Sequence, residues 1–210
     1  MNGSYLHVQW GFQCEKKGES LPLLNQVHGN TLIGVNAEQD INTLRNAPPD
    51  GDGVYAAFNG AELSVFSADC YPVLFFTEDP KGPIAAVHAG WRGIKAGIVG
   101  KTYHLLRPWG RLHAVIGPAI QSCCFTVRED FIAEWAQAGL EPNQFCELRS
   151  GKTHFDLLSF VLERELRGLS PQSIHLDNHR CTCCSLPPLP SFRRNKSANP
   201  RIRSWIRKIA

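Results

Sequence analysis

The stretch "LSVFSADCYPVLFF", residues 63–76, decides most of what the sequence predicts about the fold. Nearly every residue in it is apolar, which is typical of strands buried on both faces. The polar residues Ser67, Asp69 and Cys70 interrupt the run, and Pro72 follows them. Because proline cannot donate to a strand ladder, we expect one bent strand or two shorter strands, with an edge, a bulge or a bend near Pro72. A buried carboxylate costs free energy unless it is paired, so Asp69 calls for a chemical explanation.

Further strands and helices alternate along the rest of the chain. Apolar or alternating runs predict strands, and helical spacing predicts amphipathic helices. The expected strands are residues 5–13, 31–35, 53–58, 84–87, 112–118 and 173–179, and the expected helices are residues 94–107, 128–139 and 155–168. Because strands outnumber helices and the two are interleaved, the predicted class is mixed α and β. A chain of 210 residues fills one core, so we expect residues 1–210 to form a single domain.

Positive and negative charges are nearly balanced. The 22 basic and 19 acidic residues give a formal net charge of +3, too small to imply a nucleic-acid partner unless the charge is gathered in one place. It is partly gathered between Arg193 and Lys208. We interpret this basic run as a solvated edge strand and expect no nucleic-acid partner.

The sequence also bears on the compartment. No segment has the roughly 18 consecutive apolar residues that a membrane helix needs, and residues 1–12 lack the pattern of a secretory signal. We therefore expect no membrane association and a cytoplasmic location. There the eight cysteines would be mostly reduced, which favours thiol chemistry or metal binding over a disulfide framework.

His28, Cys70 and His88 are candidate ligands of a metal ion. Each lies at the end of an expected strand or in a loop, and imidazole nitrogen and thiolate sulfur are ligands that zinc prefers. They are far apart in sequence and match no short zinc signature, so a surface histidine and an inert core cysteine are the alternative reading. Asp69, beside Cys70, would fit as a carboxylate that orients an imidazole.

The segment "HAGWRG", residues 88–93, places several chemically useful residues after the second histidine. Gly90 and Gly93 permit a close approach of the backbone. Trp91 offers a flat face for a planar ring, and Arg92 a guanidinium suited to phosphate or carboxylate. A tight strand-to-helix turn with a stacked Trp–Arg pair would explain the same residues without a ligand.

Two further groups of cysteines remain, Cys123–Cys124 and the segment "HRCTCC" at residues 179–184. We interpret both mainly as incidental thiols, with a structural metal as the alternative. The chain does not carry the H-x-E and P-C-x-x-C signature of zinc nucleobase deaminases, which disfavours that family.

Several motifs together resemble one known family across roughly residues 22 to 203. They are "NQVHG", "DGVYAA", "SADCYPVLFF", "AAVHAGWRG", "AVIGPAIQSCCF", "CT" at residues 181–182 and "SFRR" at residues 191–194. In this order they are similar to the YfiH-like family, also called the laccase-domain or polyphenol oxidase family and now regarded as purine nucleoside phosphorylases.

The resemblance implies a fold, a metal and an activity. The fold would be of the α+β class, a single layered domain of mixed β-sheets flanked by helices, like that of certain cysteine hydrolases. One zinc would be held by His28, Cys70 and His88. The family is associated with phosphorolysis of adenosine, inosine, guanosine and methylthioadenosine and with adenosine deamination, and has also been linked to peptidoglycan-precursor editing and copper-dependent phenol oxidation.

This sequence departs from the family pattern at several places. Only about 25 residues precede "QVHG", so we expect a shortened N-terminal part compared with the family pattern. Thr126 stands where the family has a carboxylate, and Phe192 stands where it has a tyrosine. The pocket around the metal ligands is therefore expected to differ from that of its relatives.

The function predicted from the sequence is a zinc-dependent purine nucleoside phosphorylase, with adenosine deamination as a further activity. Its partners would be a purine nucleoside and phosphate. The expected catalytic residues are His28, Cys70, His88, Asp69 and Arg92, and the expected substrate-binding residues are Trp91, Arg193 and Arg194.

Other functions stay open. One is a cysteine hydrolase or amidase acting on peptidoglycan precursors, with Cys70 as nucleophile and His88 as base. Another is a degenerate binding module that uses the basic C-terminal run. Copper is less favoured than zinc because the only methionine is Met1, which leaves no Cys–His–Met arrangement of the blue-copper type.

Overall fold

A computed structural model describes residues 2–177 and 179–209. Its centre is a six-stranded sheet of order β12-β8-β6-β7-β4-β3, in which β3–β4 and β12–β8 are parallel pairs and the other pairs are antiparallel. The strands are β3 (Leu32–Val35), β4 (Gly53–Ala56), β6 (Tyr71–Thr77), β7 (Ile84–Ala89), β8 (Leu112–Ile116) and β12 (Ile174–Leu176).

A second sheet has the order β1-β2-β13-β5, with all neighbours antiparallel. Its strands are β1 (Asn2–Tyr5), β2 (Val8–Glu15), β5 (Glu62–Ser67) and β13 (Arg201–Lys208). The strand expected at residues 5–13 is therefore a hairpin of β1 and β2. The prediction of a solvated basic edge strand is wrong, because β13 lies between β2 and β5 and pairs its basic residues with protein groups. Arg203 and Arg207 contact Glu62, and buried Lys208 donates to the carbonyl of Gly82.

The stretch at residues 63–76 forms two strands that belong to different sheets, β5 and β6. Pro72 does not mark an edge, because β6 lies between β8 and β7. The ladder with β8 begins at Val73, and the carbonyl of Pro72 accepts one last bond from the Gly117 N–H at 3.1 Å. The missing N–H of proline therefore falls where that ladder ends.

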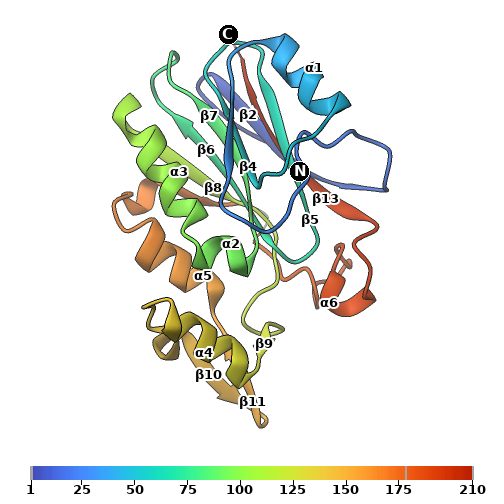
Figure 1. The fold of residues 1–210 in the computed structure, drawn as a ribbon, viewed down its shortest axis with the longest axis vertical. Helices are drawn as coiled ribbons and strands as arrows, with labels where there is room; N and C mark the ends of the chain where they lie inside the picture. The colour runs from blue at the N-terminus through green and yellow to red at the C-terminus, as the bar shows by residue number, and fades with distance from the viewer. Residues whose placement is uncertain (1, 178, 210) are drawn as a thin grey trace.

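Helices cover the outer face of the six-stranded sheet, as Figure 1 shows for α2 (Trp91–Lys95), α3 (Ile98–Leu106) and α5 (Leu157–Phe160). A π-helical turn, η3 (Val161–Glu165), extends α5. The single helix expected at residues 94–107 is split, because Gly97 adopts a left-handed φ of 77° between α2 and α3.

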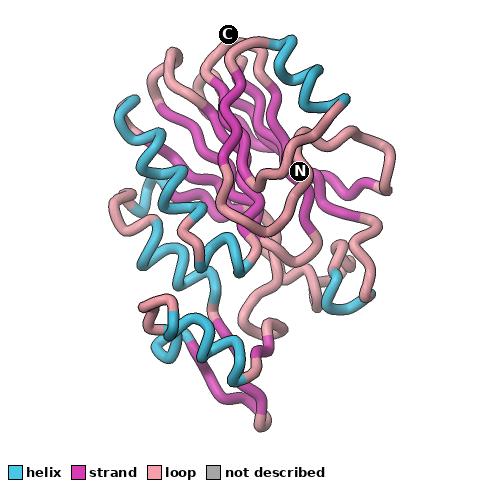
Figure 2. Tube along the Cα trace, in the orientation of Figure 1, coloured by secondary structure: helices cyan, strands magenta, loops and turns pink. Residues whose placement is uncertain are grey.

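The remaining elements lie around these layers. The α4 helix (Glu129–Gln137), which Gly139 ends as expected with a φ of 75°, packs near a small sheet at the end of the molecule that is lowest in Figures 1 and 2. That sheet has the order β10-β11-β9. The other elements are α1 (Glu38–Asn46), α6 (Phe192–Asn195), β9 (Thr126–Val127), β10 (Cys146–Arg149), β11 (Lys152–Phe155), η1 (Arg107–Trp109), η2 (Pro142–Phe145) and η4 (Pro171–Ser173).

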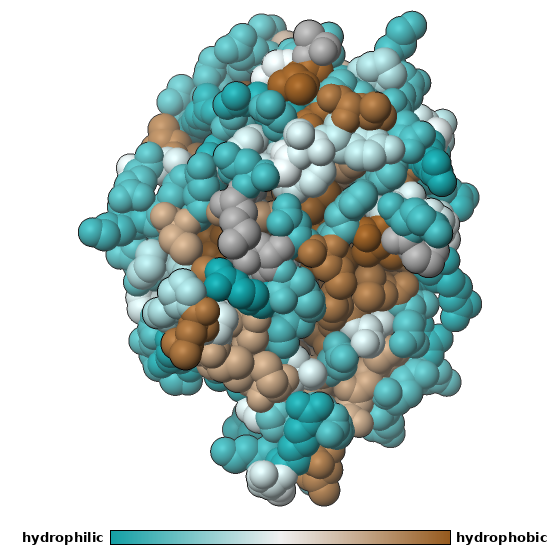
Figure 3. Space-filling model, turned by 180° about the vertical axis from the view of Figure 1, so that it is seen from behind, coloured by the Kyte–Doolittle hydropathy of each residue, from teal (hydrophilic) through white to brown (hydrophobic). Residues whose placement is uncertain are grey.

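Alternation along the central strands divides the core in two. In β6, Val73 and Phe75 pack toward the helices, whereas Leu74 and Phe76 pack toward the second sheet. Both faces are therefore buried, which explains why the sequence of β6 is almost entirely apolar. Seen from behind, the surface is mostly polar, with apolar side chains gathered in a hollow near its middle (Figure 3). Within the described residues, no helix has the length and apolar character needed to cross a bilayer.

Candidate metal centre

Three possible metal ligands from separate segments converge at one point. His28 lies in the loop before β3, Cys70 directly precedes β6, and His88 lies in β7. Their ligand atoms all lie within 4.8 Å of one another. His88 is buried, with 3% of its surface exposed, while His28 is exposed and meets the ring of His88 edge-on with 4.8 Å between centroids. The sheet therefore assembles a group that is scattered in the sequence.

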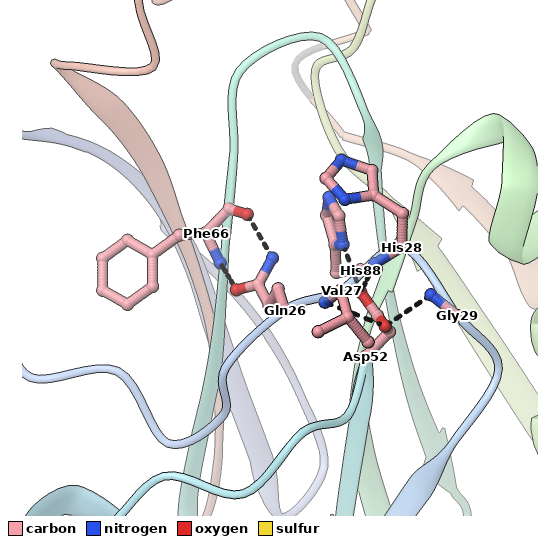
Figure 4. A network of polar contacts seen from close by, with 7 residues as sticks. All are labelled: Gln26, Val27, His28, Gly29, Asp52, Phe66 and His88. Carbon is pink, nitrogen blue, oxygen red and sulfur yellow. Dashed lines mark hydrogen bonds and ion pairs between the residues drawn. The ribbon is translucent and has the colours of Figure 1, made fainter.

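Asp52, fully buried before β4, organises two of these ligands (Figure 4). Its Oδ1 accepts the backbone N–H of His28 at 2.9 Å and lies 2.8 Å from Nδ1 of His88. Its Oδ2 accepts the N–H groups of Gly29 at 2.6 Å and Val27 at 3.3 Å. One carboxylate thus fixes both the loop that carries His28 and the ring of His88.

The contact with Asp52 also sets the tautomer of His88. An ionised carboxylate only accepts, so Nδ1 carries the proton and Nε2 is left to face Cys70 or a metal. The carboxylate that orients the imidazole is therefore Asp52 and not Asp69, which the sequence suggested. Asp69 instead accepts from Thr182 Oγ1 and from the Arg193 N–H, each at 2.6 Å.

Gln26 anchors the other end of the His28 loop. Its side-chain amide donates to the Phe66 carbonyl at 2.7 Å and accepts the Phe66 N–H at 2.8 Å, so it pairs with the end of β5 like a short strand (Figure 4). The turn between Gln26 and β3 forces His28 into a left-handed φ of 63°. Such a conformation is uncommon for a residue with a side chain and is tolerated where surrounding bonds over-determine it.

The glycines of "HAGWRG" are close-approach positions, as expected. A Cβ on Gly90 would lie 2.8 Å from a ring carbon of His28 and 3.2 Å from Sγ of Cys70. A Cβ on Gly93 would lie 2.7 Å from the carbonyl oxygen of Gly29. Only glycine leaves room for the loop and the thiol at this point.

Charge coupling within the cluster is strong. Burial alone would raise the pKa of Cys70, but His88 and His28 outweigh it and lower that pKa to about 6. Burial would lower the pKa of His88, but Cys70 and Asp52 raise it to about 9. Hydrogen bonds from His88, Gly29 and His28 outweigh burial at Asp52 and lower its pKa. At neutral pH without metal, these pKa values pair a Cys70 thiolate with a His88 imidazolium, and a metal ion binding here would displace the proton from the ring.

The cluster opens into a pocket of about 560 Å³. Apolar and aromatic side chains dominate its lining, among them Phe66, Trp91, Ile120, Phe125 and Phe192. Polar and charged groups come from Gln26, Ser67, Asp69, Arg193 and Arg201 in addition to the cluster itself. An aromatic wall with a few convergent polar groups is typical of a small-molecule site.

The arginines expected at the site are placed differently from one another. Arg193 lines the pocket, whereas Arg92 is exposed and stacks on Trp91, with its guanidinium carbon 4.2 Å from the ring centroid. The guanidinium of Arg194 donates to the carbonyls of Thr182, Cys183 and Leu189 and so braces a loop.

Thr126, which replaces a carboxylate of the family pattern, meets Arg193. The guanidinium donates to Thr126 Oγ1 at 2.7 Å and to the carbonyls of Thr126 and Cys124. These acceptors are neutral, so they hold the guanidinium in place without cancelling its charge. Arg201, which sequence reasoning missed, also lines the pocket, and its Nε donates to the Ala198 carbonyl at 3.0 Å.

The residues fit a zinc ion. Two imidazoles and one thiolate are the ligand types zinc prefers, three protein ligands are usual for a catalytic site, and the Asp52–His88 pair is the outer carboxylate contact that metal-binding histidines usually have. Asp52 is the first residue of the motif "DGVYAA", but only the fold reveals that its side chain points at His88.

The chain matches a family model described as "Multi-copper polyphenol oxidoreductase laccase" over residues 6–208. It is 36% identical over 165 residues to a purine nucleoside phosphorylase of Aquifex aeolicus, an alignment that covers 77% of this chain and 74% of the relative. It is 31% identical over 198 residues to the purine nucleoside phosphorylase YlmD of Geobacillus stearothermophilus, covering 86% and 69%.

Solved structures show the same fold. YlmD from Geobacillus stearothermophilus superposes with a TM-score of 0.75 at 27% identity, covering 90% of this chain and 76% of that one. A Bacillus licheniformis YfiH protein superposes with a TM-score of 0.76 at 25% identity, covering 90% of this chain and 74% of that one. A Neisseria meningitidis protein gives 0.80 at 23% identity over 100% of this chain and 99% of that one, which supports the fold alone.

Proposed function

Because the chain belongs to the multi-copper polyphenol oxidoreductase laccase family, we propose that it is a purine nucleoside phosphorylase whose zinc is held by His28, Cys70 and His88. The relatives named as purine nucleoside phosphorylases support the activity. The observation that carries the proposal is the ligand cluster itself, which lies in a pocket large enough for a nucleoside and lined by aromatic side chains and arginine.

The reaction would be a transfer of ribose to phosphate. A phosphate oxygen forms a bond to C1′ while the bond from C1′ to the purine nitrogen breaks, and the departing base takes the electron pair and a proton. Zinc, when bound, would supply a Lewis acid with an open coordination position beside the substrate. Asp52 would fix the direction from which His88 approaches the ion, because its carboxylate keeps the ring of His88 in one orientation.

Substrate binding would divide between aromatic and cationic parts of the pocket. Trp91, Phe66 and Phe125 offer faces and edges for a purine ring. Arg193 and Arg201 bring positive charge to the same pocket, and a guanidinium suits a phosphate oxyanion. We assign the phosphate contact to this pair in preference to Arg92, which stacks outside the lining.

The substrate range we propose is that of the family resemblance: adenosine, inosine, guanosine and methylthioadenosine. Adenosine deamination is a further proposed activity, in which water adds to the purine ring and ammonia leaves. The eight cysteines, all free in the described structure, suit a reducing compartment, and we propose the cytoplasm.

One observation favours a second candidate function. Cys70, His88 and Asp52 form a thiol–imidazole–carboxylate series, and the pKa of Cys70 is lowered to about 6. Such a series activates a nucleophile for amide cleavage when no metal occupies the thiolate. This candidate is a cysteine amidase acting on a peptidoglycan precursor.

Chromatography of adenosine incubated with the pure protein tests the proposal. We expect adenine and ribose 1-phosphate to appear only when phosphate is present, and any inosine to appear with and without it. His28→Ala and His88→Ala should each abolish turnover and lower bound zinc, whereas His104→Ala, an exposed histidine on α3, should do neither.

Two results would count against phosphorolysis. Zinc-loaded protein that leaves adenosine, inosine, guanosine and methylthioadenosine all unchanged in the presence of phosphate would refute phosphorolysis of the proposed substrates. Rapid iodoacetamide labelling of Cys70 in protein isolated without metal, together with release of an amino acid from a cell-wall peptide, would favour the amidase.

A further inference from the structure

We propose that Cys123, Cys124, Cys181 and Cys184 form a second metal site, a structural zinc tetrathiolate that joins two loops beside the pocket. The four sulfur atoms all lie within 4.8 Å of one another. The sequence suggested incidental thiols with a structural metal as the alternative, and the fold favours that alternative. None of these residues is among the His–Cys–His ligands, so the inference is independent of the proposed reaction.

The sulfur spacing matches a tetrahedron around zinc. With a Zn–S distance of about 2.3 Å, the edge between two sulfurs of a regular tetrahedron is about 3.8 Å. Sγ of Cys123 lies 3.8 Å from Sγ of Cys124 and 3.6 Å from Sγ of Cys184. Adjacent cysteines rarely share an ion, but here the turn spreads their sulfurs to the required distance.

Two one-turn loops present the thiols to each other. In the first, the N–H groups of Cys124 and Phe125 bond the carbonyl of Gln121. In the second, the Ser185 N–H donates to the carbonyl of Cys181 and closes a turn that contains Cys181 and Cys184, whose C-x-x-C spacing in the sequence is common in zinc sites.

Backbone bonds fix the relative position of the two loops. The Thr182 N–H donates to the Ala119 carbonyl at 3.0 Å, within a parallel bridge between Ala119 and Cys181. The Gln121 N–H also approaches Sγ of Cys181 at 3.5 Å, a contact that stabilises a thiolate ligand. The thiols are thus held together by the fold before any ion binds.

The charge around the cluster suits a bound tetrathiolate, which would carry a net double negative charge. The guanidinium of Arg193 lies against the carbonyl of Cys124, and that of Arg194 against the carbonyl of Cys183. Cys183 itself lies outside the sulfur cluster and packs against the hydrophobic core. It therefore offers a matched control within the same loop.

A metal at this position would stiffen the pocket wall. Thr182, between two of the ligands, donates to Asp69 at 2.6 Å, and Asp69 adjoins Cys70. Arg194 bonds the carbonyls of Thr182 and Cys183 and so ties the same loop to α6. Loss of the ion should loosen this wall and lower thermal stability without removing the first metal.

The test measures zinc per chain in protein purified under reducing conditions. The double variant His28→Ala/Cys70→Ser removes ligands of the first site and should retain about one zinc by elemental analysis and native mass spectrometry. Adding Cys184→Ser should bring the zinc content close to zero, whereas adding Cys183→Ser should leave it at one. Circular dichroism checks the fold of each variant.

Cobalt substitution of the double variant provides a readout that needs no third mutation. Four thiolates around Co²⁺ should give an intense sulfur-to-metal charge-transfer band and tetrahedral d–d absorption. Absence of both metal and band in folded protein would overturn the proposal, as would copper in place of zinc. A mass lower by two hydrogens, traced by peptide mapping to a Cys123–Cys184 disulfide, would overturn it as well.

Discussion

Replacement of Asp52 by asparagine tests how one buried carboxylate supports the candidate metal centre. Each oxygen of Asp52 accepts from two donors: Oδ1 from His28 N–H and His88 Nδ1–H, and Oδ2 from Gly29 and Val27 N–H. In Asp52→Asn one oxygen becomes an NH₂ group, which cannot accept. Whichever way the amide turns, two donors lose their partner: either the part-buried N–H groups of Gly29 and Val27, or the part-buried N–H of His28 and the buried Nδ1–H of His88.

The magnitude follows from this count. A buried donor left unsatisfied costs about 1–3 kcal/mol and a part-buried one less, so the two losses should together lower the free energy of unfolding by about 1–4 kcal/mol. The free energy of unfolding of a typical domain is only about 5–15 kcal/mol, so this loss is a substantial part of it. Loss of the carboxylate behind a histidine ligand should also weaken metal binding by about 10- to 100-fold.

Urea denaturation of the metal-free protein measures the first effect, and competition with a chelator measures zinc affinity. Asp50→Asn is the matched control, because Asp50 is exposed on the same loop and its Oδ1 accepts from the exposed Asn25 amide. The free energy of unfolding of this control should stay within about 0.5 kcal/mol of that of the parent. If Asp52→Asn behaved like Asp50→Asn in both assays, the assigned role of Asp52 would be refuted.

Three further predictions follow from the same contacts. Gly90→Ala should weaken zinc binding in the chelator assay, because the new Cβ would lie 2.8 Å from a ring carbon of His28. Gly100→Ala is the control and should bind zinc like the parent, because its Cβ would meet nothing nearer than 3.7 Å. Equal zinc affinities of the two variants would contradict the close approach at Gly90. Burial raises the pKa of Glu165 to about 7 from 4.5, so the folded protein favours the neutral carboxyl and loses stability as the pH rises through about 7. Glu165→Gln should therefore be more stable than the parent by about 2–3 kcal/mol at pH 8, and this difference should vanish near pH 4.5. A difference in urea midpoints that does not change with pH would argue against this reasoning. In metal-free protein the iodoacetamide labelling rate of Cys70, followed by peptide mass spectrometry, should rise through an apparent pKa of about 6, since two imidazoles oppose the effect of burial; a midpoint near 9 would disprove that coupling.

Much of the architecture was accessible from local pattern. The helix expected at residues 128–139 is confirmed as α4, and the helix expected at residues 155–168 corresponds to α5 and its π-helical turn. Amphipathic spacing and glycine stops are local properties, which is why they can be read from sequence. The short β10 and β11 strands were missed, because they form a hairpin with few buried residues.

Local sequence pattern did not predict which strands would pair with one another. The run of charges near the C-terminus gave no sign that β13 lies between β2 and β5, because pairing partners come from distant parts of the chain. Glu62, far away in sequence, supplies the carboxylate that Arg203 and Arg207 need in that position. A charge run is compatible with a central strand only when such partners are present.

By itself, the sequence determined the buried strand at β6, the α+β class and the types of ligand available at His28, Cys70 and His88. Only the tertiary structure decided which carboxylate orients His88, since Asp69 adjoins Cys70 in sequence but Asp52 lies across the β4–β7 pair from His88. It likewise decided that four separate thiols meet at one point. The physical reason is that composition and spacing fix chemical type and local conformation, while distances between side chains depend on strand register and loop packing.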